Sequence, residues 1–210
     1  MIPLYDEKAN QRVAWSTTLI LVANVVLFVY SAYVSRLGFE GFIDAYAFVP
    51  AGGHAKAIPM PAALFLSLFL HGGVSHLLGN MWFLWVFGRK LEDRMGAMRF
   101  LFFYVCVGFL ATLTHMMLST DLGIPLIGAS GAIAGVLGGY FLLFPFRRIH
   151  TLLPLLFFFT VVRIPAVIFL GMWFLMQLLY AKLGFSYVAW WAHVGGFVSG
   201  VLLIYPFLRR

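Results

Sequence analysis

Ser130 and His193 are the two residues whose types and surroundings could support covalent catalysis. Ser130 lies in the tetrapeptide Gly-Ala-Ser-Gly at positions 128–131, where an apolar helix is predicted to begin, and His193 lies inside another apolar segment. Polar and ionisable groups are costly at membrane depth, so they usually face an interior cavity and serve a function there. A neutral imidazole can take the proton of a serine hydroxyl and later return it to a leaving amine. The pair therefore indicates a protease whose nucleophile works inside the bilayer.

Each of the two residues has a simpler interpretation when it is taken alone. Helix starts favour serine as an N-cap in any protein, and a histidine in a helix bundle can serve only as a structural hydrogen bond. A helix start also exposes free backbone N–H groups and the positive end of the helix dipole. The N–H of Ser130 is therefore a candidate to stabilise a developing oxyanion.

Two stripes of small residues predict that the helices carrying Ser130 and His193 pack together. One stripe combines the histidine with glycines at helical spacing: His193, Gly196 and Gly200. The other follows the serine: Gly131, Gly135 and Gly139. Small residues at every fourth position let two helices approach backbone to backbone. Pairing the stripes would bring His193 beside Ser130, which favours a Ser–His dyad over the simpler interpretations.

A carboxylate to orient the histidine is missing from the sequence around the dyad. The last three predicted spans contain no Asp or Glu, and the nearest acid on the same side is Asp121. A dyad without a carboxylate is therefore the simplest arrangement.

Two histidines and an asparagine form a second polar group, with the spacing His71-x4-His76-x3-Asn80. His76 and Asn80 share one helical face at a depth similar to that of Ser130. Their side chains are predicted to complete an oxyanion hole with the Ser130 N–H, and His71 is either a supporting residue or a loop-to-helix hydrogen bond. A metal site is the weaker alternative, because the spacing matches no strong zinc signature and carboxylate partners are missing. We therefore expect no metal.

Other polar residues in apolar surroundings are predicted to be structural. Glu92 and Arg94, in the run from Gly88 to Gly96, are expected to form a clamp between the second and third spans. Asn24 and His115 are expected to form hydrogen bonds between helices.

Composition places the chain among polytopic membrane proteins. Its 210 residues are 63% hydrophobic and 10% charged, with a mean hydropathy of +0.97, which is far more apolar surface than a soluble domain could bury. The net charge of +7 does not indicate nucleic acid, because the basic residues lie in short connections between apolar runs. The single cysteine excludes an internal disulfide.

The apolar runs predict an all-α bundle of six transmembrane helices. We expect residues 1–12 to be a short cytoplasmic N-terminus and residues 13–208 to be a single membrane domain. The expected spans are 13–34, 75–92, 98–118, 130–146, 163–182 and 188–208. The two longer connections are 35–74 and 147–162. The first is expected to be irregular, with an apolar stretch at 62–70 that dips into the membrane interface.

The lysines and arginines are distributed unequally between the two sides of these spans. With six spans, both termini share a side with most of them: Lys8, Arg12, Arg89, Lys90, Arg94, Arg99, Arg147, Arg148, Arg163, Arg209 and Arg210. The opposite side holds the rest: Arg36, Lys56 and Lys182. Basic residues favour the cytoplasmic side, so both termini are predicted to be cytoplasmic and Ser130 lies toward the outer side.

The fourth span is short for a membrane crossing. Sixteen residues from Ser130 to Pro145 give roughly 24 Å of helix against a hydrocarbon core of about 30 Å. Ser130 is therefore predicted to lie below the outer surface, and residues 121–129 must descend to it as non-helical chain. Such chain is tolerated only where it lines a protein-enclosed cavity.

With these segments in this order, the chain resembles the rhomboid intramembrane serine proteases in their minimal six-span form. The resemblance rests on the His71–Asn80 segment, the Gly88–Arg94 segment, Gly128–Gly131 and Ala192–Gly200. It implies Ser130 as nucleophile, His193 as general base, and His76, Asn80 and the Ser130 N–H as the oxyanion hole. Gly128, Gly131, His71, Gly196 and Gly200 take supporting roles.

The resemblance also implies substrates, partners and location. Rhomboid proteases cleave single-span membrane proteins near the outer end of the membrane segment, generally after a small residue, and need no metal or cofactor. The expected partners are such substrates and the lipid bilayer, with no nucleic acid. The compact form suggests a prokaryotic plasma (inner) membrane. Two features depart from some members: residues 35–74 contain no Trp-Arg pair, and Ala134 stands where an aromatic side chain can stack on the histidine.

Two other functions fit six apolar spans less well. Catalytically silent relatives such as the derlins bind clients without cleaving them, but they typically lack the serine or the histidine. A transporter or channel would be expected to show an intramembrane carboxylate relay or an inverted repeat, and neither is found in the sequence.

Overall fold

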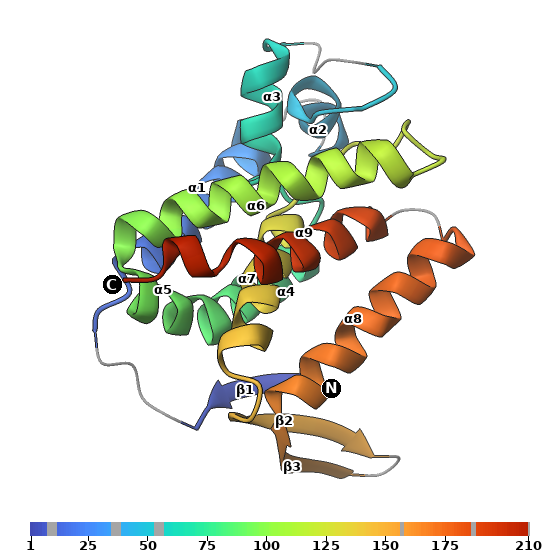
Figure 1. The fold of residues 1–210 in the computed structure, drawn as a ribbon. Coiled ribbons are helices and arrows are strands. Elements are labelled where there is room, and N and C mark those ends of the chain that lie inside the picture. Colours follow the sequence, from blue (N-terminus) through green and yellow to red (C-terminus); the bar gives the residue numbers. More distant parts are fainter. Residues whose placement is uncertain (8–11, 35–38, 53–56, 156–157, 186–187, 210) are drawn as a thin grey trace.

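The computed structural model describes the chain except residues 8–11, 35–38, 53–56, 156–157, 186–187 and 210, and the molecule is mostly helical (Figure 1). Four basic residues used above for orientation therefore lie outside the described residues: Lys8, Arg36, Lys56 and Arg210.

The helices follow the predicted spans closely. Three of them are long and apolar enough to cross a membrane: α1 (Trp15–Val34), α6 (Ala97–Leu118) and α8 (Ala166–Leu183). The predicted second span is one helical stretch made of α4 (Val74–Phe83), the π-helical η1 (Leu84–Gly88) and α5 (Arg89–Met95). Two apolar helices are shorter: α7 (Ser130–Leu143) and α9 (Trp190–Leu203), which a 3-10 turn, η2 (Tyr205–Phe207), follows. The count of six crossings stays a prediction.

α7 lies at the centre of the molecule. Every residue from Gly131 to Tyr140 is buried, and in Figure 1 α7 passes behind α6 and α9 while α8 runs along the edge. The core cluster around it contains four fully buried aromatic side chains from other helices, Phe87, Phe100, Phe103 and Tyr104, together with Tyr140 of α7 itself. Such packing suits a short helix that must hold one residue at a fixed depth.

The predicted pairing of the two glycine stripes is confirmed. A Cβ atom at Gly196 would collide with the backbone carbonyl oxygen of Gly131, and one at Gly200 would collide with that of Gly135. The backbones of α7 and α9 therefore touch, which only glycine permits at these positions.

A small antiparallel sheet corrects the all-α expectation. Its strands are β1 (Ile2–Asp6), β2 (Arg148–Leu155) and β3 (Phe158–Pro165), in the order β1-β2-β3. β2 and β3 thus pair along their full length, and the fifth helix begins at Ala166 instead of residue 163. The β-branched residues of Thr160-Val-Val-Arg-Ile164 suit a strand. The predicted start of the fifth span at residue 163 was wrong, because an apolar run does not by itself separate strand from helix.

The N-terminal segment is also folded and not a free tail. Asp6 of β1 accepts hydrogen bonds from the Tyr140 hydroxyl (2.7 Å) and from the Arg147 guanidinium (2.9 Å). The Trp82 indole N–H donates to the carbonyl of Pro3. The sequence could not reveal these contacts, because they join residues more than seventy positions apart.

Two short helices lie in the predicted irregular connection, α2 (Phe39–Tyr46) and α3 (Met60–Ser67). α3 includes much of the apolar stretch at 62–70, and eight residues are too few to cross a membrane.

Candidate active site

Ser130 is the first residue of α7, and the chain before it is non-helical, as predicted. Residues 119–129 contain no helix, and Gly128 has a φ of +110°, a conformation that L side chains rarely adopt. The Gly128 N–H donates to the carbonyl of Ser67 at 3.0 Å. Among the described residues, no side chain caps the start of α7, so the Ser130 hydroxyl and N–H are not committed to an N-cap.

His193 and Ser130 lie within hydrogen-bond distance. The His193 Nε2 atom is 2.9 Å from the Ser130 Oγ atom, and the His193 Nδ1 atom is 2.8 Å from the Gln177 Oε1 atom. An amide oxygen only accepts hydrogen bonds, so Nδ1 carries the proton and Nε2 has a free lone pair. That lone pair faces the serine hydroxyl, which is the arrangement a general base requires.

Gln177 is the residue that sequence reasoning missed. The last three predicted spans offer no carboxylate as a third group, whereas the structure supplies an amide from α8. Its signal was present in the sequence, because Gln177 is the one strongly polar side chain within the apolar run from Ala166 to Tyr180.

His71, His76 and Asn80 gather above the Gly128 turn. The Asn80 Nδ2 atom donates to His71 Nε2 at 2.9 Å, and His71 Nδ1 donates to the Phe69 carbonyl at 3.1 Å. A Cβ atom at Gly128 would lie 2.9 Å from the His76 ring and 3.5 Å from Asn80 Nδ2. Glycine at 128 therefore lets both side chains approach the turn that leads to Ser130.

His71 is neutral at physiological pH. Burial lowers the pKa of His71 from 6.5 to about 4, and the neighbouring His76 lowers it further, while the bond to Phe69 acts in the opposite direction. The neutral ring holds one N–H of Asn80, which leaves the other N–H of that amide for a ligand.

A cavity of about 340 Å³ joins these groups to the space between α4 and α8. Its lining comes from four helices: Ser75, His76, Gly79, Asn80, Phe83, Ser130, Ile133, Leu137, Trp173, Gln177, Trp190 and His193. The polar groups lie at one end, and the side chains toward the bundle interior are apolar. An extended apolar peptide could therefore reach Ser130 from the side of the bundle.

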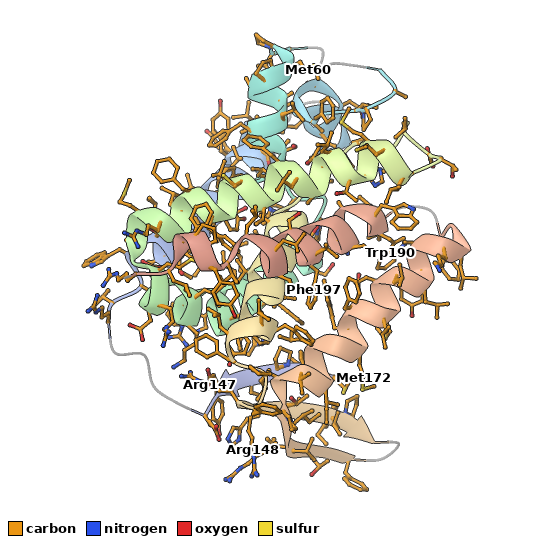
Figure 2. All side chains as sticks on the ribbon, viewed as in Figure 1. Met60, Arg147, Arg148, Met172, Trp190 and Phe197 are labelled. Carbon is orange, nitrogen blue, oxygen red and sulfur yellow. The ribbon has the colours of Figure 1, made fainter. Side chains whose placement is uncertain are left out.

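Two tryptophans flank the imidazole of His193. Their ring centroids lie 6.1 Å away for Trp173 and 5.8 Å away for Trp190, the latter edge-on at 89°. Figure 2 shows Trp190 at the start of α9 and Phe197 farther along the same helix. Ala134 is fully buried, and its Cβ lies 3.2 Å from the position of a Cβ at Gly196. An aromatic residue at 134 would not fit here, and the two tryptophans occupy the flanks of the ring instead.

The metal alternative gains no support from the geometry. Within the part of the chain that the structure describes, no three His, Cys, Asp or Glu side chains come together. Both ring nitrogens of His71 are already engaged, by Phe69 and Asn80.

Three structural predictions need correction. The Glu92 carboxylate binds α1 and not the third span, accepting from Ser16 N (2.8 Å), Thr17 N (2.7 Å) and Thr17 Oγ1 (2.7 Å). Asn24 donates to the Ile20 carbonyl in its own helix, and among the described residues the His115 ring nitrogens have no hydrogen-bond partner. Neither forms the expected bond between helices. Partner choice depends on how helices rotate against each other, which a single polar residue does not specify.

Sequence comparison relates this chain to known proteins of one family. Residues 60–210 match the Rhomboid domain. RHOMBOID-like protein 1 of Arabidopsis thaliana is 29% identical over 222 residues, which cover 93% of this chain and 54% of that protein. The mitochondrial Rhomboid protein 1 of Saccharomyces cerevisiae is 38% identical over 149 residues, covering 65% of this chain and 39% of that protein. The mitochondrial Presenilin-associated rhomboid-like protein A of Danio rerio is 29% identical over 168 residues, 79% of this chain and 41% of that protein. The chain thus spans about half the length of these relatives or less.

Proposed function

The chain belongs to the rhomboid family, and from that premise we propose that it is an intramembrane serine endopeptidase with a Ser130–His193 dyad. The observation that carries the proposal is the 2.9 Å contact between His193 Nε2 and Ser130 Oγ at the end of a largely apolar cavity. Its substrates would be single-pass membrane proteins, cut near the outer end of their membrane segment.

The proposed reaction follows from the protonation states set by the neighbours. Ser130 Oγ attacks the scissile carbonyl carbon while its proton passes to His193 Nε2. The carbonyl oxygen becomes an oxyanion that the Ser130 N–H, the free N–H of Asn80 and the His76 ring stabilise. The protonated imidazole then gives its proton to the leaving amine, which leaves an acyl-enzyme. Water, deprotonated by the same nitrogen, then attacks the acyl carbon, the bond from that carbon to Ser130 Oγ breaks, and the imidazole returns its proton to Oγ as the acid product leaves.

We further propose how the protein sits in the membrane. Apolar helices make it an integral membrane protein, and six crossings with both termini cytoplasmic would place Ser130 and His193 toward the outer side. Residues 13–208 would form the single membrane domain, with β1 folded against its cytoplasmic end. A prokaryotic plasma membrane as host is part of this proposal, and localisation of a tagged chain in its native cells would test it.

Labelling by a fluorophosphonate probe tests the dyad most directly, because such probes require an activated serine. Purified protein in detergent should be labelled at Ser130, as shown by peptide mapping. Both Ser130→Ala and His193→Ala should lose the labelling and the cleavage of a reporter membrane substrate. Ser199→Ala is the matched control, since Ser199 lies on α9 and, among the described residues, its hydroxyl bonds only the Gly195 carbonyl of the same helix.

The opposite result would change the assignment. If the folded wild-type protein is not labelled and Ser130→Ala keeps its biological activity, the chain is a client-binding relative without protease activity.

A further inference from the structure

Gln177 is a deeply buried amide whose two ends are both engaged. It is 4% exposed, its Oε1 atom lies 2.8 Å from His193 Nδ1, and its Nε2 atom donates to the Trp173 carbonyl at 3.3 Å. A buried amide is costly unless its polar atoms are paired. Here the two hydrogen bonds hold the amide in one orientation, with its oxygen toward His193.

The Trp173 carbonyl fixes the direction of the amide. If the amide were turned over, its oxygen would face the Trp173 carbonyl and its NH₂ group would face His193. The first contact would place two acceptors against each other, and the second would favour the Nδ1 lone pair and a proton on Nε2. In that tautomer His193 could not accept the serine proton. The observed orientation is therefore the one that keeps Nε2 ready to act as a base.

We propose that Gln177 is the positioning residue of the site, a neutral third member that holds His193 in its Nδ1-protonated tautomer. This inference rests on the proposed function. A serine protease triad uses a carboxylate for this role, but an ionised carboxylate deep in a helix bundle would pay a large desolvation cost. An amide orients the ring without introducing a charge.

The packing of α8 supports the same role. Trp173 and Phe174 pack on Phe197 of α9, with ring centroids 6.2 Å and 4.7 Å apart. Together with Gln177 they form the face of α8 that contacts α9. Each member of the site then comes from a different helix: Ser130 from α7, His193 from α9 and Gln177 from α8.

Three variants separate positioning from plain packing. Gln177→Met keeps the length and volume of the side chain but removes the acceptor, Gln177→Glu keeps an acceptor and adds a charge, and Leu175→Met is a control on the exposed side of α8. Each is compared with the wild type for kcat, KM, rate of fluorophosphonate labelling and melting temperature, with rates expressed per folded protein.

Loss of the acceptor should lower kcat and the labelling rate by about 10- to 100-fold, since small misorientation of a catalytic group has effects of this size. KM should change by less than about two-fold, because Gln177 acts through His193 and not through the bulk of the substrate. Leu175→Met should behave as the wild type.

The Gln177→Glu variant allows a measurement that a change in packing alone would not affect. Gln177→Glu should recover at least ten-fold of the kcat lost in Gln177→Met, and it should move the acidic limb of the pH–rate profile to higher pH, because a carboxylate stabilises the protonated imidazole. The other titratable groups that interact with His193, namely His76 and His115, are unchanged in all variants.

The outcomes distinguish the two proposals. A wild-type protein that neither cleaves nor labels at Ser130 overturns the proposed function. An active wild type whose Gln177→Met variant keeps its kcat, or whose Gln177→Glu variant shows neither recovery nor a shifted limb, overturns the role of Gln177 alone.

Discussion

Polar clusters lie at both ends of the same helix bundle, and they differ in how their hydrogen-bonding capacity is used. At the end that holds Ser130, neutral groups bind each other on one side and face a cavity on the other: Ser130, His193, Gln177 and Asn80. At the end that holds Asp6 and Glu92, charged groups bind their partners directly. Glu92 accepts three hydrogen bonds from Ser16 and Thr17, and Asp6 binds Tyr140 and Arg147.

This difference distinguishes groups that could take part in a reaction from groups that stabilise the fold. A carboxylate whose acceptor sites are filled by the start of a helix stabilises that helix and has little capacity left for a substrate. A serine, an imidazole and an amide that still offer a lone pair or an N–H to a cavity can change partners during a reaction. A polar residue within the bundle therefore indicates chemistry only when protein partners do not fill all of its hydrogen-bonding groups.

The largest expected effect is that of Asn80→Ala, and it is an effect on kcat and not on stability. Asn80→Ala should lower kcat by about 10²- to 10³-fold, because it removes an oxyanion-hole donor, while the free energy of unfolding falls by no more than about 1 kcal/mol. Kinetics on a reporter substrate and melting in detergent measure both. Asn24→Ala is the control, since within the part of the chain that the structure describes Asn24 bonds only to its own helix. An unchanged kcat would remove Asn80 from the oxyanion hole.

Glu92 should show the reverse pattern. Glu92→Ala leaves two N–H groups at the start of α1 without their acceptor, so the free energy of unfolding should fall by about 3 kcal/mol. The kcat of the folded fraction should stay within about two-fold of the wild type. The neighbouring Arg94 is exposed, and Arg94→Ala should change neither quantity. A Glu92→Ala protein that is stable but inactive would break the comparison.

The glycine contact between α7 and α9 should affect both quantities. Gly196→Ala places a methyl group against the backbone carbonyl of Gly131, so the helices must separate. We expect a loss of about 2 to 3 kcal/mol in unfolding free energy and a lower rate of Ser130 labelling.

Gly171→Ala on α8 is the matched control for that substitution. Its Cβ would meet only Phe141, at 3.9 Å, which is an ordinary contact. If the two alanine variants had equal free energies of unfolding, the backbones of α7 and α9 would not be in the close contact described above.

Low pH should lower the free energy of unfolding through His71, which lies at the end of the bundle that holds Ser130. Because its folded-state pKa of about 4 lies below the ordinary value of 6.5, the unfolded chain binds the proton first. The stability that His71 contributes is complete above pH 6.5 and declines as the pH falls toward 4, by about 2 kcal/mol at pH 5. His71→Gln keeps an acceptor for Asn80 but does not titrate, so its melting temperature should fall less between pH 7.5 and 5. If the melting temperatures of the wild type and of His71→Gln fall equally over this pH range, the role assigned to His71 is contradicted.

Much of the site could be predicted from the sequence. Apolar runs located the helices to within a few residues, and the glycine spacing on α7 and α9 indicated which two helices touch, because small residues are what permit close backbone contact. His76 and Asn80 were likewise found from helical spacing, and His71 from its place just before them in the chain. The strands were not, since β1 pairs with a segment about 145 residues away and its sequence carries no mark of that partner.

The sequence by itself therefore determined a helical membrane protein with a serine at the start of a short helix and a histidine on a facing glycine stripe. Both follow from local spacing and from the cost of burying polar groups in an apolar environment. Only the tertiary structure decided what holds the histidine and what the charged residues bind. The choice of Gln177 for His193, and of Ser16 and Thr17 for Glu92, depends on the rotation and depth of whole helices, which are set by packing across the entire bundle.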